Sequence, residues 1–513
     1  MLLWFLALLP PVFTRSLWEP DDARYAEIAR EMEESGDYGT PRLLGIPYPD
    51  KPPLSYWLTC LSLKVFGANE FAVRLPALLC GLATVLAMLR YAGFRAAAIL
   101  ATCALLLGVS QSPILDGPLS AFVILSILHA RARLNGGPRG HAWLSWVWMA
   151  LAVDVKGPVG LAPLPIVVAA LVIARRAGEL RKLDPLPGFA IFAALVVPVY
   201  ALVELRIPGF IQHFLVGQNL RGLANADENV HHGRGFLYAP AYVAGGFMPW
   251  MLALPPALAW AWKRRARWRD FEAVLPLAWF FVIFGVFAVS RSKLATYFLP
   301  AFPPLALLVG KWWEDGAPMR RGWAALWALA GLAAPVGVPL ILDLKRLSPV
   351  LAADPRVGFL VGAAAIAFAM SLLLVARLIA RGRPAAALAG VVGIIVAASA
   401  ASSLLLPPLG SFRTVGRPLL DSAREPLVVF ETEAAGVAFY RRRVPGLCGL
   451  TRDYEPLGRS PELLWPPERL GEAGSILTTF KKIPELEAHL KNRWRIIRSA
   501  DPHVLLAPLK TPE

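Results

Sequence analysis

The side chains of this sequence that are suited to chemistry are carboxylates and cations in short polar segments beside long apolar ones. Asp21 and Asp22 begin a helix-like polar stretch, and Asp50 and Lys51 follow in the same segment. Asp116 precedes an apolar run. A carboxylate orients an acceptor or takes its proton, whereas Lys and Arg bind phosphate and stabilise the charge of a leaving group. Together these residue types favour group transfer from a phosphate.

Further polar candidates are not explained by membrane topology. They are cations, tyrosines and histidines at the ends of apolar segments: Arg24, Tyr48, Lys156, Arg221, His231, His232, Lys293 and Tyr297. Ionisable groups near or within a membrane are costly and are functional candidates by default. Plainer interpretations stay open, because Asp21 and Asp116 are each placed to cap a helix and Lys51 suits an interfacial lysine.

The elements that must position these residues are membrane helices. Of the 513 residues, 56% are hydrophobic and 17% are charged, where a soluble domain carries about a quarter charged residues. The apolar residues form runs of roughly 17–22, the length needed to cross a bilayer. We therefore predict a polytopic α-helical membrane protein with about 13 spanning segments. They fall near residues 2–17, 70–90, 94–110, 113–130, 142–154, 158–174, 188–205, 237–262, 272–290, 295–311, 322–342, 357–377 and 385–406.

Basic residues in the loops predict the orientation. With the N-terminus in the cytoplasm, the loops after the even-numbered segments hold about twenty Lys and Arg residues, as the positive-inside rule requires. These loops account for the net charge of +16, and no nucleic-acid motif accompanies it, so we expect no nucleic-acid partner. An odd number of segments places the C-terminus and the polar candidates outside.

The chain divides into two predicted domains. Residues 1–410 form the transmembrane domain, with long outer segments at 16–69 and 207–234; the first contains a helix that is too polar to span and suits the membrane surface. Residues 411–513 alternate short strands and helices, which predicts a small soluble α/β domain on the outer side. The four cysteines show no metal-binding or disulfide pattern.

The first outer segment resembles the first outer loop of bacterial aminoarabinose lipid A transferases. It reads LWEPDDARYAEIAREMEESGDYGTPRLLGIPYPDKPPLSYWLTCLSLKVFGANEFAVRL, and further echoes follow in ILDGPLSAF, VKGPVGLAPLP, GQNLRGL, HHGRGFLYAPAYVAGGFMPW and SRSKLATYFLPAFPPLALL. Those enzymes belong to the GT-C superfamily, which includes the dolichyl-phosphate-mannose protein mannosyltransferases. The likeness covers about residues 15–310. It implies a GT-C type fold in the inner (plasma) membrane of a bacterium, with the active site and the C-terminal domain in the periplasm.

The resemblance also implies roles for the candidates. Asp21 and Asp116 match catalytic carboxylates, and Lys51 with Tyr48 matches the lysine motif of the donor phosphate site. Further donor positions are Lys156, Arg221, Lys293 and Tyr297, and weaker cavity candidates are Asp22, Arg24, Asp50, His231 and His232. The family's Asp-Glu is replaced by Asp-Asp, and its Glu-Lys-Pro is replaced by Asp-Lys-Pro. Both changes keep the charge and shorten the reach.

The implied function is transfer of a sugar from a polyprenyl (undecaprenyl) phosphate carrier to a lipid or protein acceptor at the periplasmic face. Aminoarabinose transfer to lipid A is one form of this reaction, and transfer like that of a protein O-mannosyltransferase is the alternative. A lipid-linked sugar flippase is disfavoured because the chain has no clear internal repeat and its ionisable residues lie at outer ends. A non-catalytic scaffold is disfavoured because both charged motifs are present. No cofactor and no metal ligands are predicted; a divalent metal between the acidic residues and a phosphate stays an open alternative, although no ligand spacing supports it.

Overall fold

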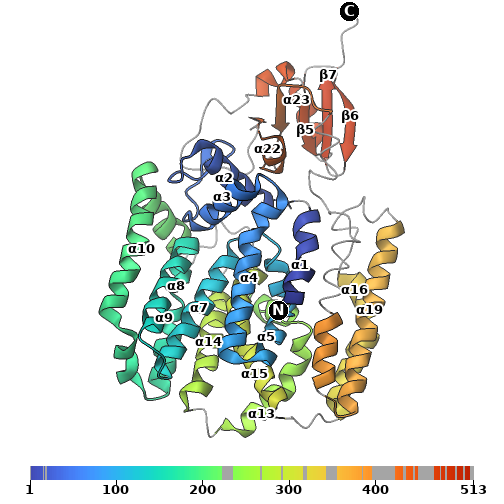
Figure 1. The fold of residues 1–513 in the computed structure, drawn as a ribbon. Helices are drawn as coiled ribbons and strands as arrows, with labels where there is room; N and C mark the ends of the chain where they lie inside the picture. The colour runs from blue at the N-terminus through green and yellow to red at the C-terminus, as the bar shows by residue number, and fades with distance from the viewer. Residues whose placement is uncertain are drawn as a thin grey trace, which may run out of the picture.

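A computed structural model describes most of the chain. The described residues are 2–15, 17, 20–221, 235–265, 269–290, 293–315, 321–341, 355–383, 385–394, 422–430, 435–442, 445–448, 467–473, 475–479, 482–490, 494–500 and 503–508. Figure 1 shows a bundle of long helices that carries a small β-sheet at one end, with α2 and α3 between the two.

The bundle helices follow the apolar segments of the sequence. In chain order they are α1 (Leu2–Thr14), α4 (Glu70–Ala92), α5 (Phe94–Ala101), α6 (Ala104–Val109), α7 (Asp116–Leu134), α8 (Gly140–Lys156), α9 (Pro163–Ile173), α10 (Pro185–Arg206), α12 (Tyr238–Gly246), α13 (Leu254–Lys263), α14 (Phe271–Val289), α15 (Phe302–Glu314), α16 (Arg321–Ile341) and α19 (Pro355–Ala380). Shorter helical turns between them are η1 (Gly157–Leu161), η2 (Ala177–Leu183), η3 (Gln212–Arg221), η4 (Trp250–Ala253) and η6 (Ala295–Ala301).

Length and composition make this a polytopic helical membrane protein. Among the described residues, α4, α10 and α14 are each long and apolar enough to cross a membrane. Two further pairs qualify as bent spans: α8 with α9, at 52°, and α12 with α13, at 101°. The described part of the chain therefore gives three to five clear spans.

The structure divides the predicted span 94–110 into two helices, α5 and α6. Thr102 marks the break, because its hydroxyl donates to the carbonyl of Ala98 at 2.6 Å and accepts from Trp250 Nε1 at 2.9 Å. The amide of Ala104 donates to the carbonyl of Met248 at 3.1 Å, outside its own helix. Hydrogen bonds to a distant segment thus replace those of a continuous helix.

The first outer segment is more structured than the sequence predicts. It contains α2 (Asp21–Ser35), a hairpin of β1 (Arg42–Leu43) and β2 (Ile46–Pro47), and α3 (Leu54–Phe66). The helix α2 ends at Gly36, whose φ of 68° is left-handed and whose amide bonds to the carbonyl of Met32. The helix α3, for which the sequence predicts no helix, packs against α2 and α4.

The C-terminal part folds as a mixed five-stranded sheet. Its strands are β3 (Leu427–Phe430), β4 (Gly446–Cys448), β5 (Ser475–Thr479), β6 (Trp494–Ala500) and β7 (His503–Pro508), in the order β4-β3-β5-β7-β6. The strand β3 is parallel to β4 and β5, whereas β7 is antiparallel to β5 and β6. The helices α22 (Ala435–Arg441) and α23 (Ile483–His489) connect strands. The predicted domain boundary near residue 410 lies outside the described residues.

Candidate functional site

Asp116 and Lys156 meet because α7 and α8 pack side by side. Asp116 is the first residue of α7 and Lys156 is the last residue of α8. Lys156 Nζ donates to Asp116 Oδ1 at 2.6 Å, and Thr296 Oγ1 donates to Asp116 Oδ2 at 3.0 Å. The ammonium also lies 4.2 Å from the centroid of the Tyr297 ring, which is cation–π geometry. The two charged side chains are largely buried, with 9% and 17% exposed.

Gly157 explains why α8 stops after Lys156. Its φ is +70°, a left-handed value that glycine adopts easily. A Cβ at this position would lie 2.5 Å from the ring of Phe214 in η3. The close approach of η3 therefore requires glycine here, and it brings η3 next to the end of α8.

Asp21 joins this cluster electrostatically. Its side chain is 48% exposed, and Arg24 lies 3.7 Å from its carboxylate. Partial burial raises the pKa of Asp21; the charges of Asp22 and Asp116 raise it further, while those of Arg24 and Lys156 oppose the rise. A carboxylate with a raised pKa is a better base near neutral pH. Asp21 is thus a half-exposed carboxylate whose pKa depends on the charges of both Asp116 and Lys156.

Asp22 is held differently from its neighbour. It is 4% exposed, and its carboxylate accepts a short hydrogen bond from Ser112 Oγ. The guanidinium of Arg74 lies 3.4 Å away and that of Arg15 3.8 Å away. With these partners, the Asp22 carboxylate forms buried ion pairs that serve a structural role. The weaker cavity candidate Asp22 therefore has a separate local environment from Asp21.

Lys51 lies between its own loop and η3. Its ammonium donates to the carbonyl of Asp50 at 2.8 Å and to Gln218 Oε1 at 2.7 Å. Burial lowers the pKa of Lys51 to about 8, and among the nearby charges those of Lys156 and Arg24 also lower it. Lys51 therefore shares an electrostatic environment with the Asp116–Lys156 pair. A phosphate bound beside Lys51 would favour the charged form of its ammonium.

Asp50 and Tyr48 line the same loop. His213 Nε2 lies 3.3 Å from Asp50 Oδ1. Burial raises the pKa of Asp50, but the hydrogen bond with His213 and the charge of Lys51 outweigh it, so the net shift is downward. Tyr48 is buried, and burial together with the charge of Asp50 raises the pKa of its phenol. Asp50 is thus held as a carboxylate and Tyr48 as a neutral hydroxyl.

Other predicted residues are placed only in part. Lys293 is 3% exposed, and its ammonium donates to the carbonyl of Ser290. Arg221 ends η3, but its side chain lies outside the described residues. His231 and His232 also lie outside them.

Three residues of the site were not among the sequence candidates. Gln218 lies within the GQNLRGL motif, and His213 lies in the second long outer segment, so each carried a weak signal. Thr296 adjoins Tyr297, but a lone threonine in an apolar context gives no sign that its hydroxyl meets a carboxylate.

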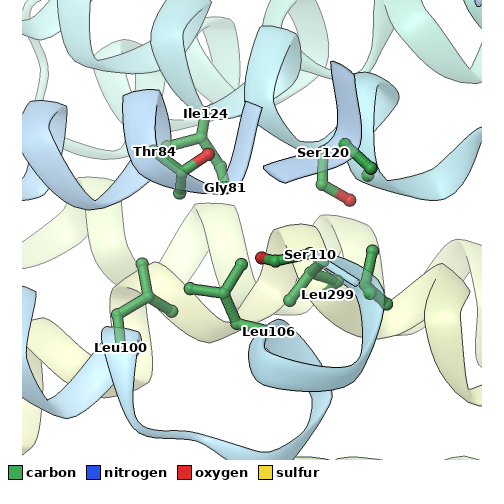
Figure 2. A pocket seen from close by; sticks show the side chains of 11 residues that line it. Gly81, Thr84, Leu100, Leu106, Ser110, Ser120, Ile124 and Leu299 are labelled. Atoms are coloured by element: carbon green, nitrogen blue, oxygen red, sulfur yellow. The ribbon is translucent and has the colours of Figure 1, made fainter. Parts of the chain in front are cut away.

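A small cavity lies along α7, beyond Asp116 (Figure 2). Its volume is about 10 Å³, and Ser110 and Ser120 line it together with Gly81 and apolar side chains. The hydroxyls of both serines are buried and have no hydrogen-bond partner among the described residues. A volume of about 10–15 Å³ suits a single water molecule. The cavity is therefore far too small for a sugar or an isoprenoid chain and is not the substrate site.

In the part of the chain that the structure describes, no group of three or more His, Cys, Asp or Glu side chains is arranged to hold a metal ion. The charged groups of the site are instead paired carboxylates and cations.

Comparison with known proteins shows that this chain is similar in sequence to glycosyltransferases. Residues 50–201 match the sequence profile of dolichyl-phosphate-mannose-protein mannosyltransferases. An undecaprenyl phosphate-alpha-4-amino-4-deoxy-L-arabinose arabinosyl transferase of Erwinia tasmaniensis is 29% identical over 388 residues, which is 72% of this chain and 69% of that protein. A second such transferase, of Sodalis glossinidius, is 34% identical over 60% of this chain and 58% of its own length.

A solved structure shares the whole fold. The crystal structure of ArnT from Cupriavidus metallidurans bound to undecaprenyl phosphate aligns with a TM-score of 0.82 and 22% identity, covering 100% of this chain and 97% of that one. The apo structure of the same protein aligns equally well. The fold of this chain, including its C-terminal sheet, is therefore that of a known membrane protein.

Proposed function

We propose that this chain is a membrane glycosyltransferase using an undecaprenyl-phosphate-linked sugar, as its match to the profile of dolichyl-phosphate-mannose-protein mannosyltransferases over residues 50–201 supports. The observation that carries this proposal is the buried contact of Lys156 with Asp116, to which Asp21 and Lys51 are electrostatically coupled. It combines carboxylates for an acceptor with cations for a phosphate. Aminoarabinose is the first donor sugar to test, since the similar transferases carry it in their names.

The proposed reaction is a single displacement at the anomeric carbon. The bond from that carbon to the donor phosphate oxygen breaks, and its electron pair leaves with the phosphate. An acceptor oxygen bonds to the carbon from the opposite face, which inverts its configuration. Lys51 and Lys156 stabilise the phosphate as its charge develops. Arg221, Lys293, Tyr48 and Tyr297 are proposed as further donor contacts.

The proposed role of Asp21 depends on the acceptor. For a hydroxyl acceptor, Asp21 takes the proton as the new bond forms, and its raised pKa suits it to that task. For a phosphate acceptor such as that of lipid A, the attacking oxygen carries no proton, and the carboxylate only orients the acceptor. Asp116 remains paired with Lys156 and keeps that ammonium charged and in place.

We also propose the finer architecture predicted from the sequence. The helices make about 13 spans with the N-terminus in the cytoplasm, in the inner membrane of a bacterium. Residues 1–410 form the catalytic domain, and residues 411–513 form a periplasmic domain. Supporting this arrangement, α2, α3 and the C-terminal sheet lie at one end of the bundle (Figure 1).

The deciding experiment is sugar transfer by the purified protein in nanodiscs. Radiolabelled undecaprenyl-phosphate sugars are supplied one at a time, with lipid A, other envelope lipids and envelope protein as separate acceptors. We expect transfer from one donor, with a loss of about 10²- to 10⁴-fold in Asp21→Asn and a strong loss in Lys51→Ala. Matched controls are Asp37→Asn and Lys64→Ala, in the same outer segment. Transfer to protein alone would select the mannosyltransferase-like alternative, and no transfer from any donor by folded protein would refute the proposal.

A further inference from the structure

The C-terminal part packs through α22 onto α2, the helix that begins with Asp21. Apolar side chains of α22, including Val437 and Phe439, belong to the same buried cluster as Ala23 and Ala26 of α2. Figure 1 shows α22 directly above α2, at the end of the bundle that carries the outer segment. The beginning of α2 is therefore covered by residues more than 400 positions later in the chain, as the separation of 423 between Leu17 and Tyr440 illustrates.

The hydroxyl of Tyr440 links three separate segments. It accepts a hydrogen bond from the amide of Leu17 at 3.1 Å and donates one to Glu70 Oε1 at 3.2 Å. Leu17 is 1% exposed and Glu70 is 5% exposed, and Tyr440 between them is partly buried. Leu17 lies shortly before Asp21 in the sequence, and Glu70 is the first residue of α4. One phenol thus connects the C-terminal domain, the entry to α2 and the start of α4.

The same stretch of α4 holds α2 from its other side. Arg74 follows Glu70 at the i+4 position, so the two side chains lie on one face of α4. Arg74 engages the carboxylate of Asp22, whereas Glu70 accepts from Tyr440. Two polar links to one face of α4 therefore flank the residues that lead into Asp21. A displacement of about 1 Å in a reacting group is enough to cost about a hundredfold in rate.

We propose that Tyr440 is a positioning residue, through which the C-terminal domain fixes the location of Asp21 without touching substrate. This inference rests on the proposed function for its kinetic consequence but not for its structural one. The hydroxyl is the essential group, because the ring of Tyr440 is retained in Tyr440→Phe while both hydrogen bonds are lost. The C-terminal domain is then part of the catalytic architecture.

The test compares Tyr440→Phe with wild type in nanodiscs, using the full chain. The matched control is Tyr91→Phe, at the opposite end of α4. Amide hydrogen exchange by mass spectrometry over residues 17–24 measures the tether directly. Steady-state transfer gives kcat and the KM for the undecaprenyl-phosphate sugar. For Tyr440→Phe we expect faster exchange at 17–24, a fall in kcat of about ten- to a hundredfold, and a donor KM within twofold of wild type. Tyr91→Phe is expected to change none of these.

The outcomes separate this inference from the proposed function. If wild type transfers no sugar, the proposed function fails, and the exchange at 17–24 alone decides whether Tyr440 holds this segment. Unchanged exchange in Tyr440→Phe overturns the inference whatever the activity. Faster exchange with an unchanged kcat overturns the positioning role. A general rise in exchange across the bundle, with a lower unfolding temperature, shows an ordinary stability contribution and overturns it as well.

Discussion

Asp21 and Asp22 are adjacent carboxylates for which the structure predicts opposite consequences of the same substitution. Asp22 is 4% exposed and lies between two guanidinium groups, of which Arg74 is fully buried at 0%. Asp22→Asn leaves these cations without their carboxylate, and breaking a buried pair in this way costs about 3–5 kcal/mol. Asp21 is 48% exposed with its partner Arg24 3.7 Å away. Exposed pairs of this kind contribute about 0–1 kcal/mol, so Asp21→Asn leaves stability nearly unchanged.

Activity is expected to follow the reverse order. As a general base, Asp21 contributes about 10²- to 10⁴-fold in rate, which is about 3–5 kcal/mol of transition-state stabilisation. Asp22→Asn, measured per folded molecule, is expected to lose less, about ten- to a hundredfold, because Asp22 acts by holding α2 in place and not on the acceptor.

The assay measures the two quantities on the same preparations. Thermal unfolding in detergent is followed by tryptophan fluorescence, and transfer is measured with the radiolabelled donor at saturating concentration. Asp37→Asn serves as the control for an aspartate elsewhere in the outer segment. The reasoning is refuted if Asp21→Asn unfolds at as low a temperature as Asp22→Asn, or if Asp21→Asn transfers sugar at the wild-type rate.

Three further outcomes are expected. Since burial lowers the pKa of Lys51 to about 8, its charge is lost as pH rises through 8, and the KM for the donor should rise above that pH. In Lys51→Arg the KM for the donor should not change with pH over this range. A KM that is also independent of pH in wild type would contradict this expectation. In Gly81→Ala the new Cβ would lie 2.2 Å from Ser110 Oγ, so the free energy of unfolding should fall by about 1–3 kcal/mol. The control Gly108→Ala, whose new Cβ meets open space, should not destabilise the protein. Equal unfolding temperatures for the two variants would contradict the packing argument. Lys156→Met leaves a buried carboxylate without the ammonium 2.6 Å away, so both the unfolding temperature and transfer should fall, the latter at least about tenfold; wild-type donor kinetics would exclude Lys156 from the phosphate site.

The sequence was sufficient to predict a polytopic helical membrane protein, whereas the roles of its polar candidates stay predictions. Apolar runs of spanning length are a strong signal, because the hydrocarbon core imposes it on every span. The pairing of Asp116 with Lys156 was beyond reach, since it depends on how two neighbouring helices align along their length. Likewise, nothing local distinguishes Asp21 from Asp22. Only the positions of Arg74 and Ser112, distant in sequence, assign one carboxylate to a buried ion pair.

Short elements escaped prediction for related reasons. The helix α3 has 13 residues, too few to span a membrane, so no spanning segment was predicted there. The break between α5 and α6 was hidden because the amide of Ala104 bonds to the carbonyl of Met248, far along the chain. Composition predicts burial, but hydrogen bonds made by remote segments decide where a helix ends.

The apolar cluster shared by α2 and α22 has a consequence for biosynthesis. The amide of Leu17 and its partner Tyr440 are 423 residues apart. At a synthesis rate of about 5–20 residues per second, α22 is synthesised about 20–80 s after the beginning of α2. During that interval Ala23, Ala26 and their apolar neighbours have no partner from the C-terminal sheet. The nascent chain therefore carries an unfinished interface for most of its synthesis, and truncation before α22 should yield a protein that is prone to aggregation or degradation.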